Sequence, residues 1–298
     1  MRHRKIVVLG GSGFIGSTFR SQLQQAHIPH LVTTHRAISV NNDDVHYLDI
    51  FDGESIVNSF ERIKHFNPTS IINCVALGVN PSERGNLQTK ATRALAQFSM
   101  NLSNLLQDAE LGLTQLVHLT TSLTEDSEYQ DPYVVHSRFL TENLKSRVPP
   151  SRFTVLSLPR VFGLNEPPGR FLGDLARSVR LSSHVKIIEP CRVRNYLSLT
   201  DLVNAVLSYV QSDETCKIQL LQVSNDEMHH LLKLVKNEGS ARAYERLVQS
   251  GFDEKLRHCD AYFYVGQDSH QRILQVELSS VLQQLEMIVW NSSYGEND

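Results

Sequence analysis

The sequence has few cysteines and no long apolar run. Its four cysteines are scattered, without the C-x-x-C spacing of a redox motif or a zinc site: Cys74, Cys191, Cys216 and Cys259. Polar residues interrupt every hydrophobic segment, so none reaches the ~18 residues of a membrane span. The basic N-terminus, Met1 to Lys5, leads into glycines rather than into the apolar region of a signal peptide. We therefore expect a reduced, cytoplasmic protein without a membrane-spanning segment.

The sequence also lacks an excess of charge of either sign. Its 29 Lys and Arg residues stand against 32 Asp and Glu residues, for a formal net charge of −3. Surfaces that bind nucleic acid or anionic membranes need an excess of basic side chains. The His, Cys, Asp and Glu residues do not show the spacing of a zinc or calcium site. We therefore expect a small-molecule substrate and no nucleic acid, membrane or metal partner.

Four glycines lie close together near the N-terminus, at positions 10, 11, 13 and 16. An apolar run of strand character, residues 5–9, ends in a turn, and an amphipathic segment begins at about Phe14. Three glycines in such a turn suit a diphosphate: one allows the bend, one lets the backbone approach the phosphates, and one lets the helix pack on the strand. The helix N-terminus then faces the anion, so we favour a dinucleotide site over a purely structural turn. Its predicted residues are Gly10, Gly11, Ser12, Gly13, Phe14, Ile15 and Gly16.

Apolar runs alternate with amphipathic segments through the first half of the chain. Strands are predicted at 5–9, 29–34, 45–48, 70–76, 115–121 and 153–158, and helices at 14–26, 53–66, 86–110 and 133–147. Short buried strands separated by helices indicate a parallel sheet that is covered on both faces. The predicted fold class is therefore α/β, a Rossmann-type doubly wound parallel sheet that binds ligands at the carboxyl ends of its strands.

The pattern changes after residue 158. Loops rich in Pro and Gly, a helix near 171–181 and an isolated strand at 185–188 indicate a smaller lobe. A helix from Thr200 and a strand near 217–223 are expected to return to the main sheet, with further helices in 226–260 and at 276–290. We therefore predict a dinucleotide-binding domain at 1–158, with returning elements at about 196–224. The small C-terminal substrate-binding lobe and the C-terminal helices would occupy 159–298.

The end of the second predicted strand bears on the choice of cofactor. An acidic residue there often binds the adenosine ribose hydroxyls, but this chain has Thr33-Thr34-His35-Arg36. Arg36 suits a 2′-phosphate through charge-assisted hydrogen bonds. We therefore predict NADP(H) in preference to NAD(H), with a solvated surface arginine as the other interpretation.

Residues after the third and fourth predicted strands complete the candidate cofactor site. Asp49 and Ile50 are candidates for the adenine edge, although Asp49 is also typical of a simple loop carboxylate. Ala76 and Leu77 follow the fourth strand and are expected to pass beneath the diphosphate and the ribose.

Seven segments in a fixed order extend this interpretation. They are Gly10–Gly16, Asp49-Ile50, Asn73 to Ala76, Leu119 to Ser122, Pro132-Tyr133, Leu158 to Gly163 and Arg194 to Asp201. In this order they resemble the extended short-chain dehydrogenase/reductase family, the NAD-dependent epimerases, dehydratases and reductases that act largely on nucleotide sugars. The stretch from Pro68 to Asn80 is most similar to the dTDP-4-dehydrorhamnose-reductase-like branch. The resemblance implies a Rossmann-type fold, a nicotinamide dinucleotide and a nucleotide-linked sugar.

The resemblance also implies a catalytic Ser or Thr, a Tyr and a Lys, with the last two spaced Tyr-x-x-x-Lys at a helix start. The tyrosine exchanges a proton with the substrate oxygen, and the lysine lowers the pKa of the phenol. Ser122 takes the hydroxyl position and Tyr133 the tyrosine position, but Ser137 stands where the lysine belongs and the basic residue is Arg138. The other register places Arg138 correctly and puts Val134 in the place of the tyrosine. No register restores both residues.

We predict Ser122, Tyr133 and Arg138 as the catalytic residues. Residues five apart on a helix are rotated by about 140°, so Arg138 assists Tyr133 only through a distorted first turn or by reaching around the helix. Ser122 is otherwise a plain loop hydroxyl, and Tyr129 is another candidate donor. His136 is a candidate substitute acid, but we favour the interpretation that it is an exposed helix histidine.

Basic residues of the smaller lobe are candidates for binding a nucleotide diphosphate, as the resemblance implies. The predicted substrate-binding residues are Arg160, Asn165 and Arg194. Arginine side chains suit that anion, although each one alone is more typical of a solvated surface. Arg194 is favoured because it begins a segment that resembles the substrate-contacting strand of the family.

Two functions are compatible with these residues. The first is an NADP(H)-dependent oxidoreductase, either a reductase or epimerase/dehydratase-like, that acts on a nucleotide-linked sugar or similar carbonyl compound. The second is a catalytically degenerate family member that binds a dinucleotide as a regulatory or scaffold subunit, which the altered Tyr/Lys motif favours. We favour the enzyme. By resemblance, the helices at 86–110 and 133–147 are expected to form a four-helix interface in a homodimer.

Overall fold

The structure is a computed structural model of the chain, which divides into two units. Unit 1 comprises residues 1–158 and 262–271, and unit 2 comprises residues 159–261 and 272–298. The residues that the structure describes are 4–35, 44–77, 87–109, 111–113, 115–125, 127–128, 130–166, 170–183, 186–187, 189–212, 220–249, 256–257, 263–265 and 278–291.

Unit 1 is built on a seven-stranded sheet in the order β11-β6-β5-β4-β1-β2-β3. Its strands are β1 (Ile6–Leu9), β2 (His30–Thr34), β3 (Val45–Tyr47), β4 (Ser70–Asn73), β5 (Gln115–Thr121), β6 (Phe153–Leu158) and β11 (Phe263–Val265). The first six are parallel, and β11 pairs antiparallel with β6. Every residue of β1 and β4 is buried, as expected of strands covered on both faces. The predicted doubly wound parallel sheet is therefore confirmed.

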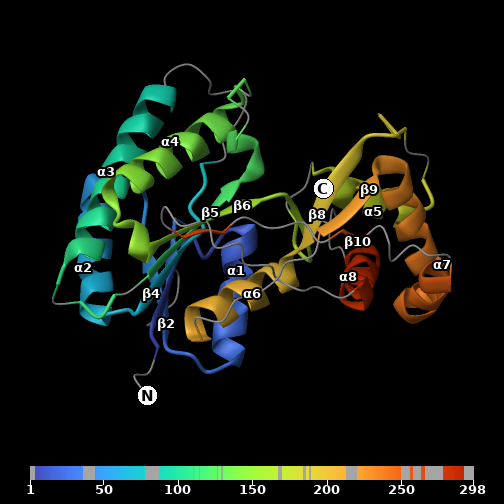
Figure 1. Cartoon of the computed structure of the whole chain (residues 1–298), viewed down its shortest axis with the longest axis horizontal. Helices are drawn as coiled ribbons and strands as arrows, with labels where there is room; N and C mark the ends of the chain where they lie inside the picture. Colours follow the sequence, from blue (N-terminus) through green and yellow to red (C-terminus); the bar gives the residue numbers. More distant parts are fainter. Residues whose placement is uncertain are drawn as a thin grey trace. The chain divides into compact units, whose positions relative to one another are not determined.

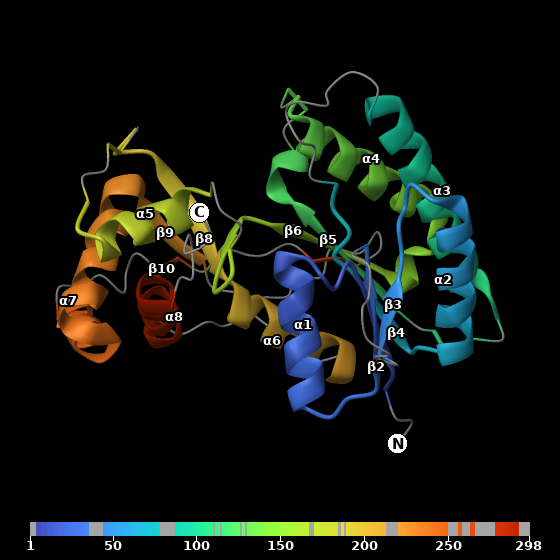
Figure 2. The same ribbon diagram turned by 180° about the vertical axis from the view of Figure 1, so that it is seen from behind.

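Helices cover both faces of this sheet. They are α1 (Phe14–Gln25), α2 (Gly53–Phe66), α3 (Leu87–Gln107) and α4 (Pro132–Arg147), with the short 3-10 helices η2 (Ser122–Glu125) and η3 (Pro150–Arg152). Figures 1 and 2 show α2, α3 and α4 side by side on one face and α1 on the other. Apolar side chains of the sheet and of the three neighbouring helices form one buried cluster, which includes Ile71, Phe60, Phe98 and Leu140.

Side-chain caps start two of these helices at the carboxyl edge of the sheet. Asp52 accepts a hydrogen bond from the N–H of Glu54 at 3.0 Å and begins α2. Asp131 accepts one from the N–H of Tyr133 at 2.9 Å, and Pro132 occupies the first helical position of α4. Aspartate at such a position satisfies one of the N–H groups that have no partner within the helix. The cap therefore explains why Tyr133 lies in the first turn of α4.

Unit 2 contains a separate four-stranded sheet in the order β10-β9-β8-β7. Its strands are β7 (Arg160–Phe162), β8 (Val193–Ser198), β9 (Leu220–Ser224) and β10 (Leu256–Arg257), and its helices are α5 (Phe171–Arg180), α6 (Leu199–Ser212), α7 (Asn225–Gln249) and α8 (Leu278–Asn291). Gly239, with a φ of +77°, interrupts α7. In Figure 1, α5, α7 and α8 lie together beside this sheet.

Two expectations for the second half of the chain are wrong. The strand expected near 217–223 does not join the main sheet, because β9 pairs with β8 and β10 in the second sheet. The strand that joins the main sheet is β11, which the sequence analysis did not predict. The isolated strand at 185–188 is also not found, since the described part of it, residues 186–187, is not in a strand.

Candidate functional site

The turn between β1 and α1 has the geometry that a diphosphate site needs. Gly10 has a φ of +78°, in the left-handed region that favours glycine. A Cβ atom at this position would lie 3.1 Å from the backbone carbonyl of Cys74. A Cβ atom at Gly16 would lie 2.7 Å from the Cα atom of Gly11. The turn is thus tight enough to admit only glycine at both positions.

The N-terminus of α1 is open to an anion. Its N-cap residue is Gly13, no side chain caps the helix, and no acidic residue lies in its first turn. Among the described residues, a Cβ atom at Gly13 would meet only the carbonyl oxygen of Gly10 within 4 Å, at 3.3 Å. Backbone N–H groups and the partial positive charge of a helix N-terminus bind phosphates. Gly10 to Gly16 therefore fit the diphosphate of a dinucleotide.

Hydrogen bonds to β2 hold this turn in place. The N–H of Gly10 donates to Thr33 Oγ1 at 3.0 Å, and the N–H of Gly11 donates to the Thr33 carbonyl oxygen at 2.7 Å. Ser12 Oγ lies 3.4 Å from His35 Nδ1. Thr33 thus supports the turn from the end of β2, near the position where domains of this fold often have a ribose-binding acid.

The residues predicted for the adenosine end are only partly described. Asp49 Oδ1 accepts a hydrogen bond from the N–H of Phe51 at 2.9 Å, which shapes the turn into α2. Ile50 is 8% exposed and belongs to the core. Arg36 lies outside the described residues. The roles of Asp49, Ile50 and Arg36 in binding a cofactor stay predictions.

A pocket between α3 and α4 opens beside the glycine turn, and we call it the α3–α4 pocket. Its lining residues are Val75, Ala76, Leu77, Leu95, His118, Leu119, Thr120, Tyr133, His136, Ser137 and Leu140. The pocket adjoins the turn because a Cβ atom at Gly10 would lie 3.2 Å from the backbone nitrogen of Val75. Three of the predicted site residues, Ala76, Leu77 and Tyr133, therefore meet at the carboxyl ends of β4 and β5.

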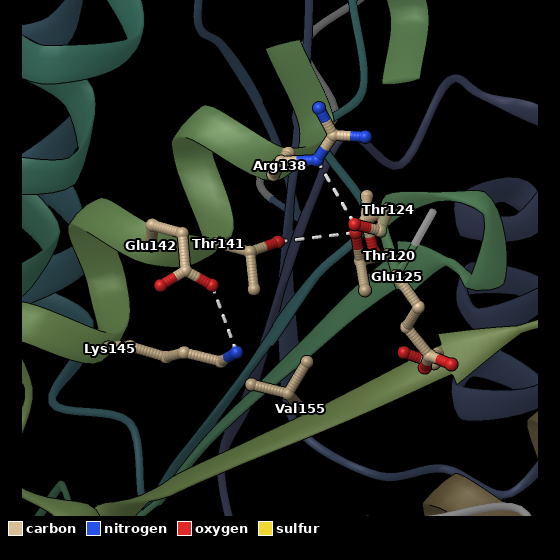
Figure 3. A pocket seen from close by; sticks show the side chains of 9 residues that line it. Thr120, Thr124, Glu125, Arg138, Thr141, Glu142, Lys145 and Val155 are labelled. Carbon is tan, nitrogen blue, oxygen red and sulfur yellow. Dashed lines mark hydrogen bonds and ion pairs between the residues drawn. The ribbon is translucent and has the colours of Figure 1, made fainter. Parts of the chain in front are cut away.

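Arg138 lies in a different place. It lines a cavity of about 220 Å³ between α4 and β6, together with Thr120, Thr124, Glu125, Thr141, Glu142, Lys145, Val155 and Ser157. Its Nε donates to the carbonyl oxygen of Thr124 at 3.0 Å, and Lys145 Nζ pairs with Glu142 Oε1 at 3.0 Å (Figure 3). Tyr133 does not line this cavity, and Arg138 does not line the α3–α4 pocket. The regular first turn of α4 thus keeps the five-residue rotation between the two side chains.

Ser122 follows the last residue of β5 and begins η2. The bond from Arg138 to Thr124 ties η2 to α4. Thr120, two residues before Ser122, lines both the α3–α4 pocket and the cavity beside β6. Ser122 is half-buried at the carboxyl end of β5, and its role stays a prediction.

A buried polar chain connects β4, β5 and α4 beneath the pocket. Asn73 Nδ2 donates to His118 Nδ1 at 3.2 Å, and His118 Nε2 donates to Thr141 Oγ1 at 3.1 Å. Thr141 Oγ1 in turn donates to the Ser137 carbonyl oxygen at 2.7 Å and forms a hydrogen bond of 3.2 Å with Thr120 Oγ1. Burial lowers the pKa of His118 to about 4, so the imidazole is neutral. Both of its ring nitrogens are satisfied.

In unit 2, basic side chains gather near the paired strands β7 and β8. The pKa of Arg194 is lowered by burial and by the charges of Arg160 and Arg192, which places these guanidinium groups near one another. Arg194 Nε donates to Asn225 Oδ1 at 3.0 Å, and its guanidinium lies 6.0 Å from the Phe171 ring centroid. These contacts hold Arg194 in one orientation.

The other predicted substrate residue, Asn165, has a different setting. It is exposed at a φ of +62° in the turn after β7. Beside it, Glu166 is 5% exposed, and burial raises its pKa to about 7, against the opposing charges of Arg170 and Arg160. Arg160 and Arg194 therefore share one electrostatic environment, whereas Asn165 shapes a turn. Their roles in binding a substrate stay predictions.

Three buried titratable residues lie near the candidate site residues: His136, which was expected to be exposed, and His118 and Glu166, which were not predicted. His136 is 2% exposed, so the expectation of an exposed helix histidine is wrong. A signal was present in the spacing, because Tyr133, His136, Leu140 and Leu144 recur at intervals of three and four and so share the buried face of a helix. Within the described residues, no group of His, Cys, Asp and Glu side chains is arranged to hold a metal ion, and no helix is long and apolar enough to cross a membrane.

A sequence model described as the NAD dependent epimerase/dehydratase family matches residues 6–219. Among curated proteins, no sequence matches the chain significantly. The resemblance to the extended short-chain dehydrogenase/reductase family is thereby confirmed, whereas its dTDP-4-dehydrorhamnose-reductase-like branch stays a prediction.

Several solved structures share the fold. MoeE5 in complex with UDP-glucose and NAD is 18% identical, with a TM-score of 0.61 over 95% of this chain and 97% of that one. UDP-N-acetylglucosamine 4-epimerase from Bacillus cereus is 13% identical, with a TM-score of 0.63 over 99% and 98% of the two chains. UDP-glucose 4-epimerase from Thermus thermophilus, in complex with NAD, is 16% identical, with a TM-score of 0.57 over 96% and 97%. At these identities the likeness shows the Rossmann-like fold and no more.

Proposed function

The chain belongs to the NAD dependent epimerase/dehydratase family, a family of short-chain dehydrogenase/reductase-type enzymes, and from this membership we propose that it acts on a nucleotide-linked sugar. The reaction is a hydride exchange between the nicotinamide of a bound dinucleotide and a carbon atom of the sugar. It leads to epimerisation, dehydration or net reduction.

One observation carries this proposal: the glycine turn and the pocket that holds Tyr133 are contiguous. Gly10 packs on the backbone of Cys74 and Val75, and the α3–α4 pocket begins at Val75. A dinucleotide whose diphosphate lies at the N-terminus of α1 would extend along the carboxyl ends of the parallel strands, where ligands of this fold bind. The tyrosine is then on the same edge of the sheet as the cofactor.

The chain's own residues have separate roles in this reaction. Gly10 to Gly16 bind the diphosphate, and Tyr133 exchanges a proton with the substrate oxygen while Ser122 donates a hydrogen bond to that oxygen. The nicotinamide, when bound, accepts and returns the hydride. Arg138 contributes by holding η2, and with it Ser122, through its bond to the Thr124 carbonyl oxygen.

The proposed substrate class rests on charge and on the solved relatives. MoeE5 was solved in complex with UDP-glucose, and the Thermus enzyme is a UDP-glucose 4-epimerase. In this chain, Arg194 and Arg160 supply guanidinium groups that suit the diphosphate of such a compound. Their grouping in unit 2 supports a nucleotide sugar over an uncharged carbonyl compound.

We infer NAD as the cofactor from the family description and from the NAD in the solved relatives. These comparisons do not support the preference for NADP(H) that Arg36 suggested. Arg36 as a ligand of a 2′-phosphate stays a prediction, because it lies outside the described residues.

The proposal is tested by incubating purified protein with NAD and a panel of UDP- and dTDP-linked sugars, with sugar products resolved by chromatography and hydride transfer followed by absorbance. Wild type is expected to convert at least one sugar, and Tyr133→Phe to lose at least ~100-fold in rate because the proton donor is removed. The matched control is Tyr244→Phe, since Tyr244 is 40% exposed on α7, and it should keep wild-type activity. Tight NAD binding without turnover on the whole panel would contradict the proposal and favour a regulatory or scaffold subunit.

A further inference from the structure

His136 is a buried imidazole whose ring nitrogens find no hydrogen-bond partner in the described part of the chain. It is 2% exposed, and neither Nδ1 nor Nε2 is paired there. Its neighbour in the pocket, His118, is equally buried but uses both ring nitrogens. A buried polar atom without a partner costs ~1–3 kcal/mol. An unpaired imidazole at this place therefore calls for a hydrogen-bonding group that the described residues do not supply.

The position of His136 relates it to Tyr133. The two residues are three apart on α4, so their side chains lie on one face of the helix. Both line the α3–α4 pocket, together with Val75, Ala76 and Leu77. Ser137, next to His136, stands where the family has its lysine. The pocket thus contains the tyrosine and the imidazoles of His118 and His136, but no lysine among the described residues.

The pocket has room for one small bridging molecule. The volume of the α3–α4 pocket is about 10 Å³, which is at the lower end of the ~10–15 Å³ that one buried water needs together with 2–4 polar partners. Tyr133, His136, Ser137 and Thr120 all line the pocket and carry polar side chains. A water at this place would hydrogen-bond one ring nitrogen of His136.

We propose that His136 is a positioning residue that exchanges the proton of Tyr133 through one trapped water, in the place of the missing lysine. This inference rests on the proposed function and deepens it, because it assigns the group that makes Tyr133 competent as a base. A neutral imidazole works here by proton exchange rather than by the positive charge that a lysine would supply.

The surroundings of His136 favour its neutral form. Burial lowers its pKa below the usual 6.5. The titratable groups that face it in the pocket are His118, from β5, and Tyr133, from its own helix; the residues contributed by α3 and by the segment after β4 are Leu95, Val75, Ala76 and Leu77. No charged side chain lines the pocket among the described residues. An imidazole that is neutral at pH 7 accepts a proton.

When the sugar hydroxyl is oxidised, every proton that leaves one group is accepted by another. The O–H bond of the sugar hydroxyl breaks, and its proton binds the Tyr133 oxygen. The original phenolic proton passes to the water, and a proton of the water passes to His136, which becomes an imidazolium ion. The hydrogen on the same sugar carbon leaves with two electrons to NAD, so the alcohol is oxidised to a carbonyl as NAD is reduced. Return of the hydride reverses each proton transfer.

The first test compares wild type with His136→Gln, which keeps a polar side chain but cannot accept a proton. We expect kcat to fall ~100-fold with an unchanged KM for the sugar, the size of a general acid–base contribution. The acid limb of the kcat profile below pH 6.5, present in wild type, should disappear in His136→Gln. The matched control is His65→Gln, since His65 is exposed on α2, and it should keep both the rate and the limb. A His136→Gln enzyme with wild-type kcat and an intact acid limb would overturn the proposal.

The second test needs neither substrate nor turnover, so it separates this inference from the proposed function. NMR titration of the histidine ring nitrogens should show the His136 signals and pKa changing in Tyr133→Phe but not in Tyr244→Phe. A His136 titration that is identical in wild type and Tyr133→Phe would overturn the relay, whatever the turnover. If Tyr133→Phe changes the His136 titration but wild type converts no nucleotide sugar, the result supports the proton relay and contradicts the proposed function. Circular dichroism of each variant confirms that the fold is retained.

Discussion

At the residue scale, the glycines of the first turn each have a separate task. Gly10 takes a left-handed φ, Gly13 leaves the helix N-terminus open, and Gly16 lets α1 approach the turn closely. These tasks were predictable from the spacing alone, because a strand, a tight turn and a helix leave few alternatives for glycine. The burial of His136 was predictable only from helical periodicity, and its unpaired nitrogens were not, since they depend on contacts across α4 and β5.

Gly13→Ala is expected to weaken NAD binding at least ~10-fold, about 1.4 kcal/mol, because the added methyl group occupies space at the N-terminus of α1. The folded state should lose at most about 1 kcal/mol, since alanine is a poorer N-cap than glycine and the new Cβ meets only the Gly10 carbonyl oxygen among the described residues. Titration calorimetry and thermal unfolding measure the two effects.

Gly16→Ala serves as the contrasting variant. Its Cβ would lie 2.7 Å from the Cα of Gly11, so it should destabilise the fold by ~1–3 kcal/mol. Unchanged NAD affinity in Gly13→Ala would refute the role given to this helix N-terminus.

Glu166 makes the stability of the protein depend on pH. Burial raises its pKa to about 7 from the usual 4.5, so the folded state binds a proton more tightly than the unfolded state. Its contribution to the free energy of unfolding is complete below the unfolded pKa and is lost as pH rises through about 7. Relative to Glu166→Gln, wild type should lose on the order of 3 kcal/mol between about pH 5 and about pH 8. Parallel stability curves for the two proteins, from urea unfolding at each pH, would show that folding does not raise the pKa of Glu166.

At the scale of elements, the polar side chains of α4 line two different cavities. Tyr133, His136 and Ser137 line the α3–α4 pocket, whereas Arg138, Glu142 and Lys145 line the cavity beside β6. The helix itself was predictable from Asp131, Pro132 and the apolar residues that follow. The sequence could also show that Tyr133 and Arg138 diverge by about 140°. It could not show that Arg138 bonds the Thr124 carbonyl oxygen, because that contact depends on where η2 lies.

Thr141→Val tests the polar chain that joins α4 to the sheet. The substitution keeps the shape of the side chain but removes the acceptor of the His118 Nε2 proton, so it leaves a buried donor unpaired. The free energy of unfolding should fall by about 1–3 kcal/mol, measured by urea denaturation. Thr18→Val, on the half-exposed face of α1, should change it by less than about 0.5 kcal/mol. Equal stability of the two variants would argue against a contribution from the chain.

In unit 2, a strand could be predicted from the sequence, but the strand with which it pairs could not. An apolar run at 217–223 predicts a strand, and β9 is found at Leu220–Ser224. The run does not reveal its partner, because two buried sheets require the same apolar side chains. β11 escaped prediction since a three-residue strand has too few positions to show a period.

At the scale of the whole molecule, the two units contain separate groups of candidate residues. Unit 1 contains the glycine turn and the Tyr133 pocket, and unit 2 contains the Arg160 and Arg194 pair. The expected homodimer through the helices at 86–110 and 133–147 stays a prediction. The class of cofactor could be predicted from one local motif, the glycine turn. The class of substrate could be predicted only from the family resemblance, because substrate recognition depends on side chains from distant segments of the chain.

Arg36→Ala tests the choice between NAD and NADP. If NAD is the cofactor, wild type binds NADH more tightly than NADPH, and the variant leaves that preference unchanged. The measurement is a fluorescence titration of both reduced cofactors into both proteins. A wild-type preference for NADPH that Arg36→Ala abolishes would instead establish the 2′-phosphate contact and contradict NAD.

The central claim is that the N-terminus of α1 and the glycine turn bind the diphosphate of a nicotinamide dinucleotide. Isothermal titration calorimetry of the full chain with NAD tests it most directly. The account predicts saturable heat with one dinucleotide bound per chain, and at least ~10-fold weaker binding in Gly13→Ala. Absence of heat with NAD, NADH, NADP and NADPH alike would contradict it.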